Sequence, residues 1–160
     1  MKSCIPGDNK KIFPTYNQVR DKNAVVTEVS QLLLDEEADH LIKTAKDRGL
    51  ERSQVRGNES NEYSGVRTSS TSFLEKNHDP IVSCIEQRIA TVAQQPVSKL
   101  EPLQVTAYSL GQKYDPHHDY FDDDKIGKQG QRTLTVFSYL NTVDSGCGGA
   151  TAFPLLKITF

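Results

Sequence analysis

Three consecutive polar residues, His117, His118 and Asp119, offer the clearest chemistry in the sequence. In an extended segment, side chains two positions apart project from the same face, so His117 and Asp119 point together and His118 points away. Their backbone positions are then roughly 6–7 Å apart, and both side chains reach a cation bound at about 2.1 Å. The spacing therefore predicts a pair of metal ligands, one imidazole and one carboxylate.

The residue types alone leave several interpretations of this pair open. An imidazole and a carboxylate, completed by a second imidazole, bind iron(II) and leave three coordination positions for co-substrate and oxygen. A His-x-Asp sequence also occurs often as a surface pair that binds no metal. A hydrolytic zinc site is a weaker interpretation, because it needs further His or Cys ligands that the sequence does not offer.

Two helices are predicted before this segment. Asp35 opens the first, with acidic residues in its first turn, where they suit the helix dipole, and Gly49 stops it. The second begins at Asp79-Pro80, because proline is favoured in the first turn of a helix. Both segments carry apolar residues at helical spacing.

Strands are predicted on both sides of these helices. Residues 24–29 form a short apolar run, and after Pro102 the period changes to two, as expected of a half-buried strand over residues 103–107. Residues 133–140 and 152–160 are also rich in strand-forming residues. Helices first and strands later predict an α+β fold with an antiparallel sheet.

Length and composition set broad limits. The 160 residues suffice for one domain with a core. We expect this domain over residues 24–160, after an extended arm or poorly ordered tail over residues 1–23 that lacks periodicity. The formal charge of −2 argues against a phosphate-neutralising nucleic-acid binder. No apolar run approaches the roughly 18 residues of a membrane span, and no signal peptide is expected.

Three cysteines, Cys4, Cys84 and Cys147, stand at wide and irregular spacing. This spacing fits neither a disulfide framework nor a zinc site, so we expect three ordinary thiols.

Several motifs, in a fixed order, resemble the catalytic domain of the prolyl 4-hydroxylase family. They are Leu34 to Ile42, Val66 to Ser70, Tyr108 followed by Gly111-Gln112, Tyr114 followed by His117-x-Asp119, Arg132 to Asn141, and Gly148 to Pro154. In the last motif Ala150 replaces the usual acidic residue. The resemblance covers roughly residues 24–160 and identifies the chain as a relative of these iron(II)- and 2-oxoglutarate-dependent dioxygenases.

The resemblance implies a fold and a set of roles. The fold would be N-terminal helices packed on an antiparallel double-stranded β-helix, or jelly roll, incomplete in this chain. His117 and Asp119 would bind iron(II), Tyr108 would reach 2-oxoglutarate, and Tyr114 and Arg132 would line a groove for the peptide. The implied reaction is hydroxylation of peptidyl proline, with ascorbate as the reductant that restores the iron.

The sequence also departs from the family. The family has a third ligand, a histidine, and a lysine that pairs with 2-oxoglutarate, yet no histidine follows His118 here. We therefore expect the front part of a catalytic domain, inactive or nearly so alone, with Leu103, Val105 and Val136 left exposed. The alternative is a non-catalytic peptide-binding or subunit-interaction module. Relatives work mostly in the endoplasmic reticulum, but a cytoplasmic protein stays possible, and the oligomeric state is unknown.

Overall fold

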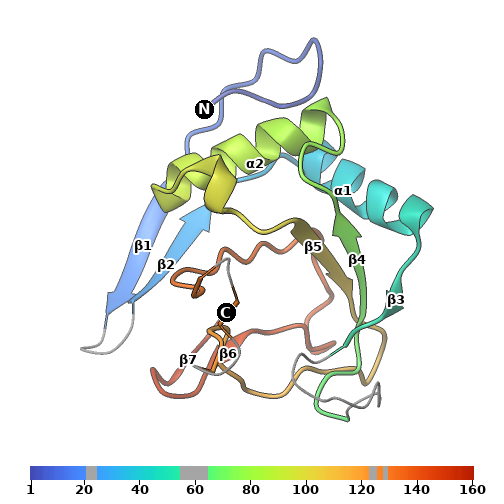
Figure 1. Ribbon diagram of the computed structural model, residues 1–160, viewed down its shortest axis with the longest axis vertical. Coiled ribbons are helices and arrows are strands. Elements are labelled where there is room, and N and C mark those ends of the chain that lie inside the picture. Colours follow the sequence, from blue (N-terminus) through green and yellow to red (C-terminus); the bar gives the residue numbers. More distant parts are fainter. Residues whose placement is uncertain (21–24, 55–64, 123–125, 128–129) are drawn as a thin grey trace.

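The computed structural model describes residues 1–20, 25–54, 65–122, 126–127 and 130–160. Two helices, α1 (Asp35–Arg48) and α2 (Pro80–Ala93), lie side by side over one side of a three-stranded antiparallel sheet (Figure 1). The strand order of this sheet is β3-β4-β5, and its bounds are Glu51–Arg52, Ser70–Leu74 and Leu103–Ala107. A short 3₁₀ helix, η1 (Val97–Lys99), links α2 to β5.

Two further antiparallel pairs flank this unit. Strands β1 (Thr15–Arg20) and β2 (Val25–Ser30) pair from Thr15 opposite Ser30 to Arg20 opposite Val25. Strands β6 (Ala152–Phe153) and β7 (Ile158–Thr159) form a small hairpin near the end of the chain. The α+β class is confirmed, whereas the jelly roll remains a prediction.

Helix α1 begins at Asp35, as its acidic first turn predicts, and α2 begins directly after the predicted cap. The Asp79 side chain accepts hydrogen bonds from the backbone N–H groups of Ile81 and Val82, both at 2.8 Å. Pro80, directly after this cap, has no N–H group that would need a partner. At the C-terminal end of α1, Gly49 has φ +97°, a conformation that costs glycine little. The predicted starts and the Gly49 stop are therefore confirmed.

The core lies between the helices and the central sheet. Leu74, Val82 and Ile85 are fully buried there, and Leu41 is nearly so. Each such side chain contributes about 1.5–3 kcal/mol on burial. Leu103 and Val105 pack against this cluster and are partly buried, so the expectation that they would be exposed is wrong. For Val136 the expectation holds, with 37% of the residue exposed.

A buried ion pair also joins the two helices. Arg88 of α2 donates through Nη1 to Oε2 of Glu37 at 2.5 Å and through Nη2 to Oε1 at 2.8 Å. The Glu37 carboxylate also accepts from the backbone N–H groups of Cys4 and Leu34. Burial raises the pKa of Glu37, but the hydrogen bonds from Arg88, Leu34 and Cys4 outweigh it, and the net pKa is lowered.

The N-terminal segment, expected to be an extended arm or poorly ordered tail, contains one strand and two buried residues. Residues 15–20 form β1, and Cys4 and Ile12 are buried at 8% and 3% exposure. The sequence of this segment lacks periodicity because single buried residues hold it to the fold, whereas a helix or half-buried strand would repeat apolar residues along one face. The predicted domain boundary near residue 24 stays a prediction.

The cysteine prediction is wrong for two of the three residues. Cys4 and Cys84 form a disulfide with their Cα atoms 5.6 Å apart. They are separated by 80 residues, so only the packing of the N-terminal segment against α2 brings them together. Cys147 is free and exposed.

Two predicted strands near the C-terminus also differ. Residues 133–140 form no strand, because a strand requires a neighbouring backbone to pair with and the described residues place none there. The apolar run over residues 152–160 is not one strand but the β6–β7 hairpin. Pro154 stands at its turn, where a fixed φ and a missing N–H favour a break in the ladder.

Neither helix in the described parts of the chain is long and apolar enough to cross a membrane.

Candidate metal centre

The segment that carries His117 and Asp119 follows β5 and is held against residues 66–68. Thr68 N–H donates to the carbonyl of Lys113 at 2.8 Å, and Asp115 N–H donates to the carbonyl of Val66 at 2.8 Å. An isolated antiparallel bridge joins Arg67 to Tyr114. These contacts fix the backbone directly before the proposed ligands.

His117 and Asp119 do not lie in a regular strand, contrary to the extended geometry assumed from the sequence. Pro116 follows the bridged residues and has no N–H group to continue a ladder, so pairing stops there. Only the alternation of side chains is kept. His118 turns away and stacks on Tyr120, with ring centroids 4.8 Å apart.

The two proposed ligands converge. Nε2 of His117 lies 3.2 Å from Oδ1 of Asp119, and the side chains are 38% and 47% exposed. Two ligands bound at about 2.1 Å in adjacent positions of an octahedron are about 3.0 Å apart. The separation therefore fits one shared metal ion, and it equally fits a direct contact between a protonated imidazole and a carboxylate.

The hydrogen bond of the other His117 nitrogen shows that a positive charge is needed between the two side chains. Nδ1 lies 2.8 Å from the carbonyl oxygen of Asp115, and a carbonyl only accepts hydrogen bonds, so Nδ1 carries a proton. In a neutral ring the lone pair then lies on Nε2, facing a carboxylate oxygen that is also an acceptor. Two acceptors at this distance need a positive partner, either a second proton or a metal ion. A histidine anchored through its other nitrogen to a carbonyl is also how metal-binding histidines are commonly oriented.

The Tyr114 ring supports His117. The two rings stack with centroids 3.7 Å apart and an angle of 16° between planes. The guanidinium carbon of Arg67 lies 4.7 Å from the centre of the Tyr114 ring, a cation–π contact. Arg67 in turn donates to the carbonyl of Gln54 at 3.2 Å and to the hydroxyl of Thr71 at 3.4 Å.

Arg132 lies beside Asp119, the other proposed ligand. It forms a two-point ion pair with Glu101, with Nε to Oε1 at 2.6 Å and Nη2 to Oε2 at 2.7 Å. Its Nη1 reaches the backbone carbonyl of Asp119 at 3.3 Å, and its guanidinium lies 4.5 Å from the centre of the Phe121 ring. The hydrogen bonds that Arg132 donates to Glu101 outweigh partial burial and raise the pKa of Arg132, which stays charged.

Tyr108 lies one residue beyond the end of β5 and is 49% exposed. Within the described structure its hydroxyl has no hydrogen-bond partner, so a ligand could take that position. Tyr114 and Arg132 lie close to the His117–Asp119 pair, as the contacts above describe. The roles proposed for all of these residues stay predictions.

Two functional candidates, Arg67 and Glu101, received no role from sequence reasoning. Arg67 lies in the Val66 to Ser70 motif, and Glu101 lies two residues before β5. Their contacts with Tyr114 and Arg132 span long sequence separations, so only the folded chain reveals them.

Across the described ranges, no three His, Cys, Asp or Glu side chains gather where they could hold one metal ion. The donor set of His117 and Asp119 suits iron(II) in type, with one nitrogen and one carboxylate oxygen, but it supplies only part of a complete site.

Comparison with known proteins identifies the class. Residues 103–158, which contain the proposed ligands, match the 2OG-Fe(II) oxygenase superfamily. This part of the chain is therefore similar to 2-oxoglutarate- and iron(II)-dependent oxygenases.

The most informative relatives are plant prolyl 4-hydroxylases. Probable prolyl 4-hydroxylase 7 of Arabidopsis thaliana is 46% identical over 128 residues, which are 78% of this chain and 40% of that protein. Prolyl 4-hydroxylase 2 is 48% identical over 125 residues, 76% of this chain and 41% of that protein. Probable prolyl 4-hydroxylase 8 is 45% identical over 127 residues, 78% of this chain and 43% of that protein. The predicted family is confirmed as prolyl 4-hydroxylase-type, and the chain spans about two-fifths of these relatives' length.

Proposed function

We propose that this chain supplies the first two iron ligands of a prolyl 4-hydroxylase, which hydroxylates peptidyl proline with iron(II), 2-oxoglutarate and ascorbate. Its likeness to prolyl 4-hydroxylases along most of its length supports the reaction class. One observation carries the proposal for the site: Nε2 of His117 and Oδ1 of Asp119 converge at 3.2 Å while Nδ1 is held by a carbonyl.

Each residue has a defined task in this proposal. His117 would bind iron through Nε2, and Asp119 would bind it through its carboxylate. Iron(II), when bound, supplies the activation of oxygen that is coupled to oxidation of 2-oxoglutarate. Tyr108 would donate its free hydroxyl to 2-oxoglutarate, and Tyr114 would keep the His117 ring in its orientation.

The peptide would lie along the surface formed by Tyr114 and Arg132. Proline-rich segments bind to aromatic rings because their extended helix is already ordered before binding. The partly exposed aromatic rings and guanidinium groups near the metal pair provide such a surface. Arg132 would present N–H groups to peptide carbonyls after adjusting its contact with Glu101.

Activity of the chain alone should be very low. It offers two of three expected protein ligands, and the co-substrate would lack a basic partner for its far carboxylate. A charge-assisted hydrogen bond of that kind contributes about 1.5–3 kcal/mol. In a hydroxylation assay with iron(II), 2-oxoglutarate, ascorbate and a proline-rich peptide, turnover at an ordinary enzymatic rate would contradict this expectation.

The second candidate is a non-catalytic module that binds a peptide or another subunit. Its support is that the described residues gather no complete ligand set and that the His117–Asp119 pair is substantially exposed. Such a module would bind proline-rich peptide without metal.

Calorimetric titration separates the two candidates. Manganese(II), a stable mimic of iron(II), and 2-oxoglutarate are added singly and together. The oxygenase proposal expects each to strengthen binding of the other, and His117→Ala to remove metal binding. His118→Ala is the matched control, because His118 turns away from the pair, and it should leave the affinity unchanged. Peptide binding that needs neither manganese nor His117 would favour the module.

A further inference from the structure

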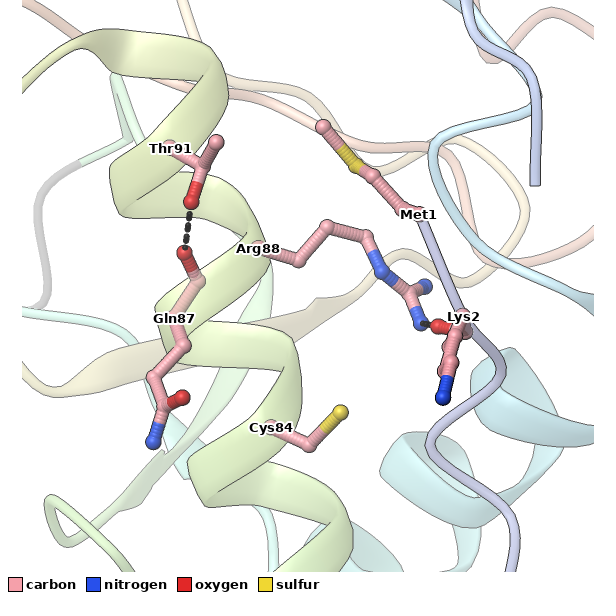
Figure 2. A pocket seen from close by; sticks show the side chains of 6 residues that line it. All are labelled: Met1, Lys2, Cys84, Gln87, Arg88 and Thr91. Atoms are coloured by element: carbon pink, nitrogen blue, oxygen red, sulfur yellow. Dashed lines mark hydrogen bonds between the residues drawn. The ribbon is translucent and has the colours of Figure 1, made fainter. Parts of the chain in front are cut away.

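The disulfide between Cys4 and Cys84 has two chemically unequal sulfurs. Cys4 is buried, with 8% of the residue exposed, whereas Cys84 is partly exposed on α2. An open hollow of about 210 Å³ reaches Cys84 and is lined also by Met1, Lys2, Gln87, Arg88 and Thr91. Cys4 does not line it. Figure 2 shows Cys84 and Arg88 projecting from α2 toward the segment that carries Met1 and Lys2.

The buried sulfur has a cationic neighbour. Nη2 of Arg88 donates to Sγ of Cys4 at 2.9 Å, and the same group donates to the carbonyl of Lys2 at 2.6 Å. Arg88 is 4% exposed, so water screens its charge little. Although Glu37 balances much of that charge, the guanidinium nitrogen lies against the Cys4 sulfur and would stabilise negative charge developing there.

Thiol–disulfide exchange depends on these two properties. A thiolate attacks the sulfur that it can reach, and the reaction is faster when the departing sulfur carries negative charge more easily. Here access favours Cys84 as the attacked atom, and Arg88 favours Cys4 as the departing atom. Both factors act in the same direction.

We propose that Cys84 is a modification site, at which a small anionic thiol opens the disulfide through the hollow. The incoming thiolate forms a bond to Sγ of Cys84, the Cys4–Cys84 bond breaks, and its electron pair leaves on Sγ of Cys4. Cys84 then carries a mixed disulfide, and the Cys4 thiolate takes a proton from solvent or remains beside Arg88. A second thiol can release Cys84, so that two thiols are oxidised to one disulfide while the protein disulfide is reduced.

The charge of the hollow selects the kind of thiol. Lys2 is exposed at its edge and Arg88 lies in its wall. Glutathione, with two carboxylates and one ammonium group, suits such a site better than a neutral or cationic thiol. Opening would release the covalent link between the N-terminal segment and α2.

The test is mass-spectrometric mapping in a Cys147→Ser background, which removes the exposed free thiol. The oxidised protein is treated with glutathione, quenched at early times with a maleimide, and digested. We expect about tenfold more glutathione on Cys84 than on Cys4. Equal modification, preference for Cys4, or a disulfide that resists glutathione in the folded protein would overturn the proposal.

If the disulfide opens with no detectable adduct, single-cysteine proteins decide the matter. Cys4→Ser and Cys84→Ser, each in the Cys147→Ser background, are treated with oxidised glutathione. Because Arg88 favours the Cys4 thiolate, only better access can make Cys84 the faster thiol. Modification of Cys84 supports the proposal, and a Cys84 that stays unmodified in the folded protein refutes it.

The role of the hollow has its own test. Lys2→Glu should slow attack by glutathione about threefold to tenfold and leave attack by neutral 2-mercaptoethanol unchanged. Lys11→Glu is the matched control, because Lys11 pairs with Lys2 through the backbone but does not line the hollow. Equal slowing by both substitutions would show that only overall charge matters and would refute the selection.

Discussion

Arg132 and Glu101 form a two-point ion pair across 31 residues of sequence, and Arg132 also reaches the backbone of Asp119. The pair therefore links the start of β5 to the proposed metal centre. Its side chains are 37% and 47% exposed, so solvent screens the attraction. We infer that the pair positions Arg132 more than it stabilises the fold.

Glu101→Gln tests this inference. The amide keeps the size of the side chain but loses the charge, so Arg132 should become more mobile. We expect the free energy of unfolding in urea to fall by less than about 1 kcal/mol. Binding of proline-rich peptide should change severalfold, in the same direction as in Arg132→Gln. A large loss of stability without any change in peptide binding would show that the pair is structural.

Tyr114→Leu tests whether the stacked ring orients His117. Removing the ring leaves the imidazole held only by its contacts with Asp115 and Asp119, so manganese affinity should fall about threefold to tenfold. Tyr114→Phe keeps the ring and should retain the affinity. Tyr120→Leu, which removes the ring stacked on His118, is a second control and should also have no effect. Equal losses from Tyr114→Leu and Tyr120→Leu would contradict a specific role.

The parts of the fold that sequence predicted are those determined by neighbouring residues. Asp79-Pro80 and Gly49 mark helix ends because capping acts within a few residues. The convergence of His117 and Asp119 follows from two-residue alternation, which survives even without a regular strand. These features need no knowledge of the tertiary structure.

The features that sequence missed depend on distant partners. The link between Cys4 and Cys84 requires the N-terminal segment to lie on α2, which no local pattern indicates. The run over residues 133–140 has the composition of a strand, but composition does not supply a backbone to pair with. Arg67 likewise reaches Tyr114 only because two segments 47 positions apart meet in one bridge.

Asp79 has two roles that substitution can separate. Oδ1 caps α2, and Oδ2 lies 2.8 Å from Nε2 of His40 on α1. Asp79→Ala removes both contacts and should lower the free energy of unfolding by about 1–2 kcal/mol. Asp79→Asn keeps an oxygen for the cap and should recover most of that loss. If the two variants were equally unstable in urea, the contact with His40 and not the cap would be the main contribution.

Glu37→Gln should be the most damaging of these substitutions. It leaves the buried Arg88 guanidinium without its carboxylate, and removing one partner of a buried ion pair costs about 3–5 kcal/mol. Urea unfolding should show a much earlier midpoint or no cooperative transition. Glu36→Gln, at the exposed neighbouring position, is the matched control and should change the midpoint little.

The pH dependence of stability follows from the lowered pKa of Glu37. Because folding lowers this pKa, the unfolded chain binds the proton more readily, and acid favours unfolding. The stabilisation from the Glu37 carboxylate should be fully present above the ordinary glutamate pKa of about 4.3 and be lost as the pH falls below it.

Asp79, whose pKa is also lowered despite partial burial, adds a loss of stability in acid of the same sign. Thermal unfolding between pH 7 and pH 3 should therefore show a steep fall in Tm, and Asp79→Asn should make that fall shallower. A Tm that stays constant down to pH 3 would mean that neither carboxylate is ionised in a stabilising pair.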